Sequence, residues 1–269
     1  MDERPIGVFD SGLGGLTTVK RLAEFLPGED IIYLGDTGRV PYGSRSRETI
    51  IKYARQDAAF LESFDIKAMV VACNTACSVA FDELDEAYDM PVYEVIRTPA
   101  KAAAQLSRNR KIGVIGTVAT IDSGAYETAL NEIAPGFEVI SAACPLFVPL
   151  VENGRTDADD VAALTIAEDY LELIRDAGVD TLIMGCTHYP LLRDVISKVM
   201  GQDVTLVDSG AETAKVVAAE IHNMKIRSES GKTGTIRYFV TDNAEKFAIL
   251  ASCFIGSDIS GQVGQVTLE

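Results

Sequence analysis

Two cysteines stand in matched contexts that suit acid and base chemistry. Cys73 and Cys186 each follow an apolar run that is typical of a buried strand. The residues that come next favour a helix start, with Asn74 and Thr75 as N-caps after the first cysteine and Pro190 in the first turn after the second. A thiol at the carboxyl end of a strand lies where open α/β sheets bind ligands. A helix N-terminus there predicts a lowered thiol pKa.

Paired thiols on opposite sides of a bound carbon can invert its configuration, because one thiolate removes a proton while the other thiol supplies one. This reaction needs no metal, redox couple or covalent cofactor. A disulfide redox pair is the first alternative, but its usual C-x-x-C signature is absent from the sequence. A zinc site is the second, and it would have to add Cys77 and His188 to the pair. Otherwise Cys77, Cys144 and Cys253 are expected to pack as small hydrophobic side chains.

A glycine-rich turn with an acidic residue follows the first apolar run. Residues 10–15 read Asp-Ser-Gly-Leu-Gly-Gly, which has the look of a phosphate-binding turn between a strand and a helix. The spacing is not G-x-G-x-x-G, since Thr17 stands in the place of the last glycine, and Asp10 would repel a phosphate. A small polar ligand is therefore favoured over a dinucleotide. The turn-rich loop 35–43 is expected at the same sheet edge.

Composition limits the class of protein. The chain has 269 residues, 24 basic and 40 acidic side chains, a formal net charge of −16 and 47% hydrophobic residues. These values are ordinary for a globular protein of one large or two medium domains. The negative charge argues against nucleic acid or an anionic membrane as partners. No apolar run approaches a membrane span, and five cysteines without an export signal predict reduced thiols in a cytoplasmic protein.

Short β-branched runs alternate with longer amphipathic segments, which is the pattern of a parallel α/β fold. The expected strands are residues 6–9, 31–34, 68–72, 92–96, 111–115, 138–141, 181–184, 204–207 and 236–240. The expected helices include residues 16–26, 48–64, 159–177 and 211–224. The polar stretch 227–234 is expected to be a surface loop.

A weak internal echo predicts two similar halves. The run around Gly7 resembles the run around Gly113 at an offset of 106, and the steps that end in Cys73 and Cys186 match at an offset of 113. Offsets that nearly agree are expected from two similar α/β units, each with a cysteine at the same structural place. Chance similarity between common strand patterns is the alternative.

These motifs together resemble the glutamate racemases of the aspartate/glutamate racemase family. The matching segments are residues 7–15, 41–43, 72–76, 144–152 and 185–191. The Thr-His-Tyr-Pro run after the second cysteine is more similar to the glutamate enzymes than to the aspartate racemases. The resemblance implies an isomerase that interconverts L- and D-glutamate without cofactor or metal and supplies D-glutamate for peptidoglycan.

The resemblance also implies the fold and the site. The fold would be α/β, with two similar open parallel-sheet domains facing each other across a cleft, formed by residues 1–97 plus 210–269 and by residues 98–209. The acid/base pair would be Cys73, which takes the proton from D-glutamate, and Cys186, which takes it from L-glutamate, with Asp10 and His188 as helpers. The implied substrate contacts are Asp10, Ser11, Pro41, Tyr42, Gly43, Asn74, Thr75, Glu152, Thr187 and His188. Glutamate is the implied partner, and a homodimer is compatible with the resemblance.

Regulation is expected to be simple. Some members of the family carry an N-terminal extension and are activated by UDP-N-acetylmuramoyl-L-alanine, whereas five residues precede Ile6 here. We therefore expect activity that is independent of this nucleotide, with Arg97 and Arg108 as the side chains that could still bind it.

Two other functional classes compete with a racemase. A cysteine hydrolase or amidotransferase would use one thiol as nucleophile with His188 as base, which leaves Cys73 without a role. An amino-acid-binding module would need the cleft but neither thiol.

Because glutamate and the protein are both acidic, a glutamate site must rely on local donors, namely backbone N–H groups and the hydroxyls of Ser11, Thr75 and Thr187.

Overall fold

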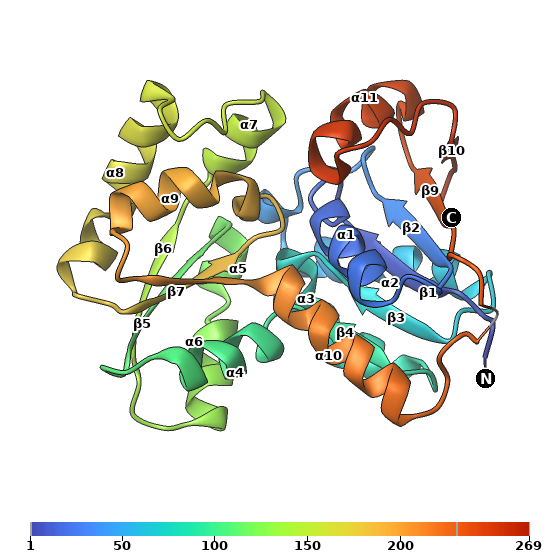
Figure 1. Ribbon diagram of the computed structural model, residues 1–269, viewed down its shortest axis with the longest axis horizontal. Helices are drawn as coiled ribbons and strands as arrows, with labels where there is room; N and C mark the ends of the chain where they lie inside the picture. Colours follow the sequence, from blue (N-terminus) through green and yellow to red (C-terminus); the bar gives the residue numbers. More distant parts are fainter. Residues whose placement is uncertain (1, 230, 269) are drawn as a thin grey trace.

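The computed structural model describes residues 2–229 and 231–268, which form two parallel β-sheets with helices on both faces (Figure 1). The strands are β1 (Ile6–Asp10), β2 (Ile31–Gly35), β3 (Ala68–Val71), β4 (Val92–Glu94), β5 (Lys111–Gly116), β6 (Glu138–Ala143), β7 (Thr181–Gly185), β8 (Thr205–Asp208), β9 (Ile236–Val240) and β10 (Val263–Gln265). The α-helices are α1 (Leu16–Phe25), α2 (Arg47–Glu62), α3 (Asn74–Ala87), α4 (Arg97–Leu106), α5 (Val118–Asp122), α6 (Ala125–Ile133), α7 (Phe147–Glu152), α8 (Val161–Asp176), α9 (Arg193–Met200), α10 (Ser209–Asn223) and α11 (Ala244–Ile255). Two short 3₁₀ turns are η1 (Tyr42–Ser44) and η2 (Tyr189–Leu192).

The two sheets share one strand order. The first runs β10-β9-β2-β1-β3-β4 and the second runs β6-β5-β7-β8, so β2-β1-β3-β4 corresponds strand by strand to β6-β5-β7-β8. The similarity between the two sequence runs therefore has a structural basis, since Gly7 and Gly113 lie on the corresponding strands β1 and β5. The two similar parallel-sheet units predicted from the sequence are confirmed.

The chain completes the first sheet only after it has built the second. Figure 1 shows the early, blue strands on the right, the green and yellow elements on the left, and the red C-terminal elements back on the right. Strand β8 still belongs to the second sheet, whereas β9 pairs with β2. The exact boundaries, at residues 97/98 and 209/210, stay a prediction.

All nine predicted strands are confirmed, and no end differs by more than two residues. Strand β10 was not predicted, because it has only three residues with a glycine in the middle and pairs along one edge with β9. The four predicted helices correspond to α1, α2, α8 and α10. In the predicted surface loop, residues 227–229 and 231–234 form neither helix nor strand.

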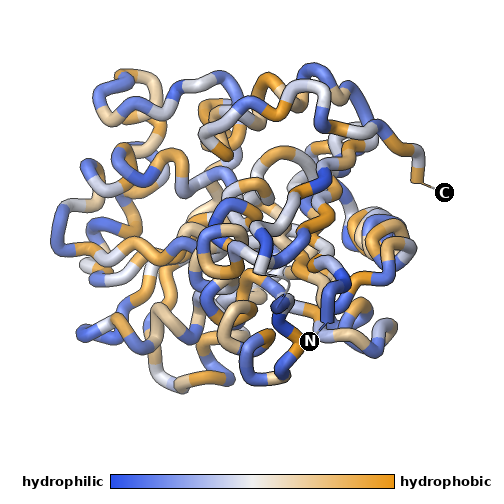
Figure 2. Tube along the Cα trace, turned by 45° about the vertical axis from the view of Figure 1, so that its right-hand side comes forward, coloured by the Kyte–Doolittle hydropathy of each residue, from blue (hydrophilic) through white to orange (hydrophobic). Residues whose placement is uncertain are grey.

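Helices cover both faces of each sheet. The first sheet packs against α1, α10 and α11 on one face and against α2 and α3 on the other. The second packs against α7, α8 and α9 on one face and against α4 and α6 on the other. Hydrophobic segments follow the buried elements, and hydrophilic colour marks many of the outer turns (Figure 2). None of the helices in the described ranges is long and apolar enough to cross a membrane.

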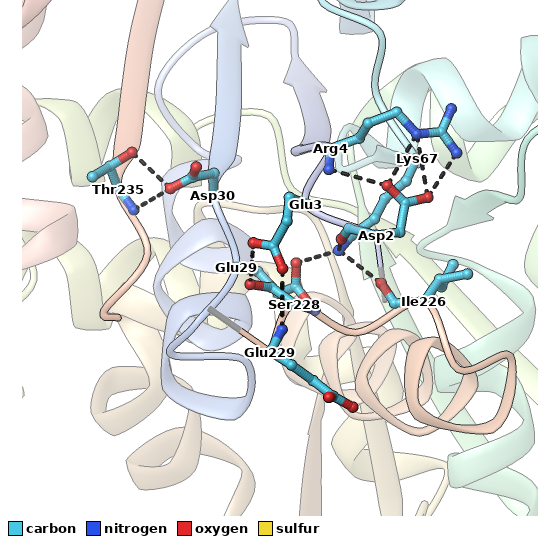
Figure 3. A network of polar contacts seen from close by, with 10 residues as sticks. All are labelled: Asp2, Glu3, Arg4, Glu29, Asp30, Lys67, Ile226, Ser228, Glu229 and Thr235. Atoms are coloured by element: carbon cyan, nitrogen blue, oxygen red, sulfur yellow. Dashed lines mark hydrogen bonds and ion pairs between the residues drawn. The ribbon is translucent and has the colours of Figure 1, made fainter. Parts of the chain in front are cut away.

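A buried ion pair lies at the amino-terminal ends of the strands of the first sheet (Figure 3). The Nζ atom of Lys67 lies 2.5 Å from Oε2 of Glu29, and neither side chain is more than 1% exposed. The same ammonium donates hydrogen bonds to the backbone carbonyls of Asp2 at 2.6 Å and Ile226 at 2.8 Å. The other carboxylate oxygen of Glu29 accepts the N–H of Ser228 at 2.8 Å. One buried charge pair thus joins the N-terminal segment, the start of β3 and the segment after α10.

Lys67→Met should destabilise the fold, because it leaves the Glu29 carboxylate buried without a counter-charge. Removal of one partner from a buried pair costs about 3–5 kcal/mol, and urea unfolding followed by circular dichroism measures this. The control is Lys215→Met, which breaks an exposed pair with Glu212 and should cost less than about 1 kcal/mol. Equal losses in the two variants would contradict a special role for the buried pair.

Candidate active site

One cavity of about 350 Å³ lies where the carboxyl ends of strands from both sheets meet. Loops that follow β1, β2, β3, β5, β6 and β7 line it, as expected for ligand sites in open parallel sheets. It is lined by Ser11, Gly12, Val40, Pro41, Tyr42, Gly43, Ser44, Cys73, Asn74, Thr75, Thr117, Val118, Pro145, Val148, Pro149, Glu152, Cys186, Thr187 and His188. Every residue predicted for the site is among them except Asp10.

Cys73 caps helix α3 with its own side chain. Its Sγ accepts the backbone N–H of Ala76 at 3.5 Å, and its thiol donates to Oγ of Ser11 at 3.5 Å. The prediction that Asn74 and Thr75 cap this helix was wrong, because the helix already begins at Asn74. Both side chains are instead free for contacts with the second half of the protein.

Cys186 occupies the corresponding place in the second half, directly after β7. A 3₁₀ turn of 4 residues follows it, with Pro190 near its start as predicted, and α9 begins only at Arg193. The Cys73 side of the cavity therefore faces the N-terminus of a regular helix of 14 residues, whereas the Cys186 side faces a short turn.

The predicted lowering of the thiol pKa values was wrong. Burial, together with the negative charge of Asp10, raises the pKa of Cys73 to about 12 and raises the pKa of Cys186 still further above its ordinary value. The hydrogen bonds of Cys73 with Ser11 and Ala76, and the bond from the N–H of His188 to Cys186, oppose the rise but do not cancel it. Desolvation outweighs the helix N-terminus, so both thiols rest protonated, and either thiolate would be a strong base.

Asp10 lies behind the cavity wall and is 1% exposed. Its carboxylate accepts the N–H of Gly12 at 2.9 Å and the hydroxyl of Thr187, from the other half, at 3.5 Å. Burial raises the pKa of Asp10, while the nearby His188 lowers it. Nε2 of His188 lies 3.2 Å from Oε1 of Glu152, so this pair stands beside Cys186.

Threonine hydroxyls connect the two halves at the cavity wall. Oγ1 of Thr75 lies 2.9 Å from Oγ1 of Thr117, which also lies 2.9 Å from Oγ1 of Thr120. Thr117 lines the cavity but was missed from the sequence. The offset of 106 between the two halves could have found it, because that offset places Thr117 at the position of Ser11.

Tyr42 is among the residues that line the cavity, but its hydroxyl is engaged elsewhere. That hydroxyl is held between the buried carboxylates of Asp36 and Asp57, the second at 2.9 Å. Arg39 binds the same two carboxylates at 2.6 and 2.8 Å. The contact of Tyr42 with substrate stays a prediction, and it would have to use atoms other than the hydroxyl. The cluster of Asp36, Asp57 and Arg39 fixes the loop that carries Gly43.

The cavity offers many neutral donors and acceptors but no cationic side chain. Among the described residues that line it, none is Lys or Arg. Residues 2–229 and 231–268 contain no group of three or more His, Cys, Asp or Glu side chains placed to hold a metal ion. The zinc alternative requires about four such ligands.

Gly14 brings the two halves into close contact. A Cβ atom at this position would lie 2.0 Å from Oγ1 of Thr187 and 2.5 Å from Nδ1 of His188. Thr17, in the first turn of α1, donates to the backbone carbonyl of Thr187 at 3.0 Å. The absence of a side chain at Gly14 therefore sets the positions of two residues that follow Cys186.

The chain is similar in sequence and structure to known racemases. The family model described as Asp/Glu/hydantoin racemase matches residues 7–217. A glutamate racemase from Geobacter metallireducens is 48% identical over 269 residues, which cover 100% of this chain and 98% of that protein.

Two solved structures share the whole fold. A glutamate racemase isoform from Bacillus anthracis superposes with a TM-score of 0.95 at 40% identity, covering 100% of this chain and 99% of that one. The glutamate racemase of Francisella tularensis, solved in complex with D-glutamate, gives a TM-score of 0.93 at 39% identity with the same coverage.

The thiols should stay protonated in the free protein at neutral and mildly alkaline pH. In a Cys253→Ser variant, which removes the exposed cysteine, burial raises the pKa of each of the four remaining thiols. Absorbance at about 240 nm should therefore show no thiolate step between about pH 6 and pH 9 while the protein stays folded. A step of one thiolate near pH 7 would restore the prediction of a lowered pKa.

Gly14→Ala should lower activity by more than about tenfold, because the added methyl group displaces Thr187 and His188 from the cavity wall. Gly28→Ala is the matched control, since a Cβ there would meet only the carbonyl oxygen of Lys232 at an ordinary 3.5 Å. Racemisation rates of both variants, with circular dichroism to check folding, test the expectation. Normal activity in Gly14→Ala would mean that the two halves separate without consequence for the site.

Proposed function

The chain belongs to the Asp/Glu/hydantoin racemase family, and from this premise we propose that it interconverts L- and D-glutamate by proton transfer between two thiols and Cα, without a bound cofactor. One observation carries the proposal: Cys73 and Cys186 leave corresponding strands of two similar halves and line the same cavity. Residues that follow each cysteine, together with Ser11 and Thr117, supply the neutral donors that such a reaction needs.

The proposed step moves one proton off Cα and another onto it. With L-glutamate, the thiolate of Cys186 takes the Cα proton, the electron pair stays on Cα beside the carboxylate, and the thiol of Cys73 delivers its proton to the opposite face. With D-glutamate the roles reverse. The sulfur that was a thiolate ends as a thiol and the other ends as a thiolate, so charge is conserved and nothing is oxidised.

Buried thiols suit this chemistry in spite of their raised pKa values. Each unit by which the pKa of a thiol lies above the working pH adds about 1.4 kcal/mol to the cost of its thiolate. The same shift makes the thiolate a stronger base toward a weakly acidic C–H bond. The ammonium group of a bound amino acid would place positive charge near both sulfurs and offset the effect of Asp10.

Neutral groups can hold glutamate in this cavity. Its carboxylates would accept hydrogen bonds from backbone N–H groups at the start of α3 and from the hydroxyls of Ser11, Thr75, Thr117 and Thr187. Its ammonium would donate to Oδ1 of Asn74, which is buried and has no hydrogen-bond partner within the described chain. The same donors would stabilise charge that develops on the carboxylate next to Cα.

The competing functions fit the site less well. A cysteine hydrolase would use His188 as base for Cys186, but Nε2 of that ring faces Glu152 and the scheme leaves Cys73 idle. An amino-acid-binding module would give no reason for two thiols at corresponding places.

As part of the proposal, the product D-glutamate serves peptidoglycan synthesis. A cytoplasmic location and a homodimer stay predictions from the sequence.

The test is incubation of L-glutamate with the purified protein in heavy water, followed by circular dichroism and mass spectrometry. The signal should decay to zero, and the D-glutamate formed early should carry one deuterium while the remaining L-glutamate carries none. Deuterium that enters L-glutamate as fast as it enters the product would support a single base instead of two.

Cys73→Ala and Cys186→Ala should each reduce racemisation at least about a hundredfold, because each removes one proton-transfer partner. Since the enantiomers have equal free energies, kcat/KM must fall equally for both. Cys253→Ala, on the exposed face of α11, is the control and should retain full activity. Near-normal activity in either of the first two variants would refute the two-thiol scheme.

A further inference from the structure

Tyr126 on helix α6 touches both loops that carry the cysteines, although it does not line the cavity. Its hydroxyl accepts a hydrogen bond from Nδ2 of Asn74 at 2.9 Å, and Asn74 directly follows Cys73. Its ring packs against Gly185, which directly precedes Cys186, since a Cβ at that glycine would lie 2.8 Å from Cε2 of Tyr126. The side chain of Tyr126 is 1% exposed.

A closed network fixes the orientation of the Asn74 amide. Nδ2 of Asn74 donates to the carbonyl of Val95 at 3.0 Å as well as to Tyr126, and the hydroxyl of Tyr126 donates to the same carbonyl at 3.0 Å. A carbonyl can only accept, so a flipped amide would set Oδ1 against the oxygen of Val95. Nδ2 is therefore held toward Val95 and Tyr126, and Oδ1 must point away from this network.

The remaining atom of the amide is the one that a substrate can use. Asn74 lines the cavity, and its buried Oδ1 has no hydrogen-bond partner within residues 2–229 and 231–268. A buried acceptor without a donor is costly, and an ammonium group would supply that donor.

We propose that Tyr126 is a positioning residue for substrate binding, which acts through Asn74 by holding its amide with Oδ1 available to the ammonium group. The proposal rests on the proposed function, because it takes an α-amino acid as the ligand. Tyr126 comes from the second half, Asn74 from the first, and Val95 from the segment that connects β4 to α4. The network therefore orders one ligand contact at the place where the two halves join.

The hydroxyl of Tyr126 keeps its proton at any working pH. Burial, with a smaller contribution from Glu94, raises the pKa of Tyr126 well above its ordinary value. Its donation to Val95 therefore persists, and Asn74 always meets the lone pair of a neutral hydroxyl.

Tyr126→Phe keeps the ring against Gly185 and removes only the hydroxyl. Nδ2 of Asn74 then loses one acceptor, and the amide is no longer confined to one orientation. We expect KM for glutamate to rise about tenfold or more while kcat stays within about threefold, because the lost contact binds ground state and transition state alike. Tyr238→Phe, a buried tyrosine on β9 remote from this network, is the matched control and should leave both parameters unchanged.

A double-mutant cycle distinguishes positioning from general support of the fold. In an Asn74→Ala background, Tyr126→Phe should change kcat/KM by less than about twofold, since the residue through which it acts is gone. An equal loss of kcat/KM in both backgrounds would show that Tyr126 acts independently of Asn74. Unchanged KM in the single variant would also overturn the proposal.

A measurement on the wild-type protein keeps the test independent of variant folding. The side-chain amide protons of Asn74, assigned by their absence from the Asn74→Ala spectrum, should exchange slowly with solvent, because Nδ2 is buried and hydrogen-bonded. Fast exchange would refute the network.

If wild-type protein fails to racemise glutamate, the proposed function fails on that result alone. Calorimetric binding of glutamate to wild type and Tyr126→Phe then decides the role of Tyr126, and equal affinities would reject it.

Discussion

Removal of ionisable groups from water is the constraint on which the rest of the site depends. Cys73, Cys186 and Asp10 are each at most 5% exposed, and burial is the largest cause of the raised pKa of all three. A resting thiolate would be unstable in such surroundings, so charge has to appear only together with a ligand. In the proposed reaction, the same burial strengthens every hydrogen bond aimed at the developing carbanion. A site that is poor at holding charge at rest is therefore well suited to forming it briefly.

The cavity is enclosed because the two halves meet through very small groups. Gly14 lets one loop approach Thr187, and Gly43 does the same at Thr117, where a Cβ would lie 3.0 Å from the threonine Cβ. Hydroxyl pairs such as Thr75 with Thr117 then satisfy polar groups across the junction. Larger side chains at these glycines would hold the halves apart and admit water. The glycine-rich turn that looks suited to phosphate in the sequence thus serves the contact between the halves.

Much of the fold could be predicted from the sequence, because strands buried on both faces read as short apolar runs. The cysteines could be found for the same reason, since each one ends such a run. What could not be predicted depends on contacts between distant parts of the chain. The pKa of Cys73 reflects burial and the charge of Asp10, which is distant in sequence, and the proposed role of Tyr126 depends on Asn74, 52 residues away. The hydroxyl of Tyr42 is engaged by Asp57 beneath the loop, which no local pattern indicates.

Two similar halves supply two thiols, but the surroundings of the thiols differ. Cys73 has Ser11 and the helix N–H of Ala76, whereas Cys186 has the N–H of His188 and the nearby pair of that histidine with Glu152. Asp10 has no acidic counterpart, since the offset of 106 places a glycine at its equivalent position, the end of β5. This asymmetry is required, because a protein built of L-residues cannot present mirror-image environments to the two faces of Cα. Because the enantiomers have equal free energies, the reaction crosses the same barrier in both directions. The two half-sites therefore do not have to be alike. In the proposed mechanism, duplication of the fold therefore places the two bases, and the unequal residues around them adapt each one to its own face.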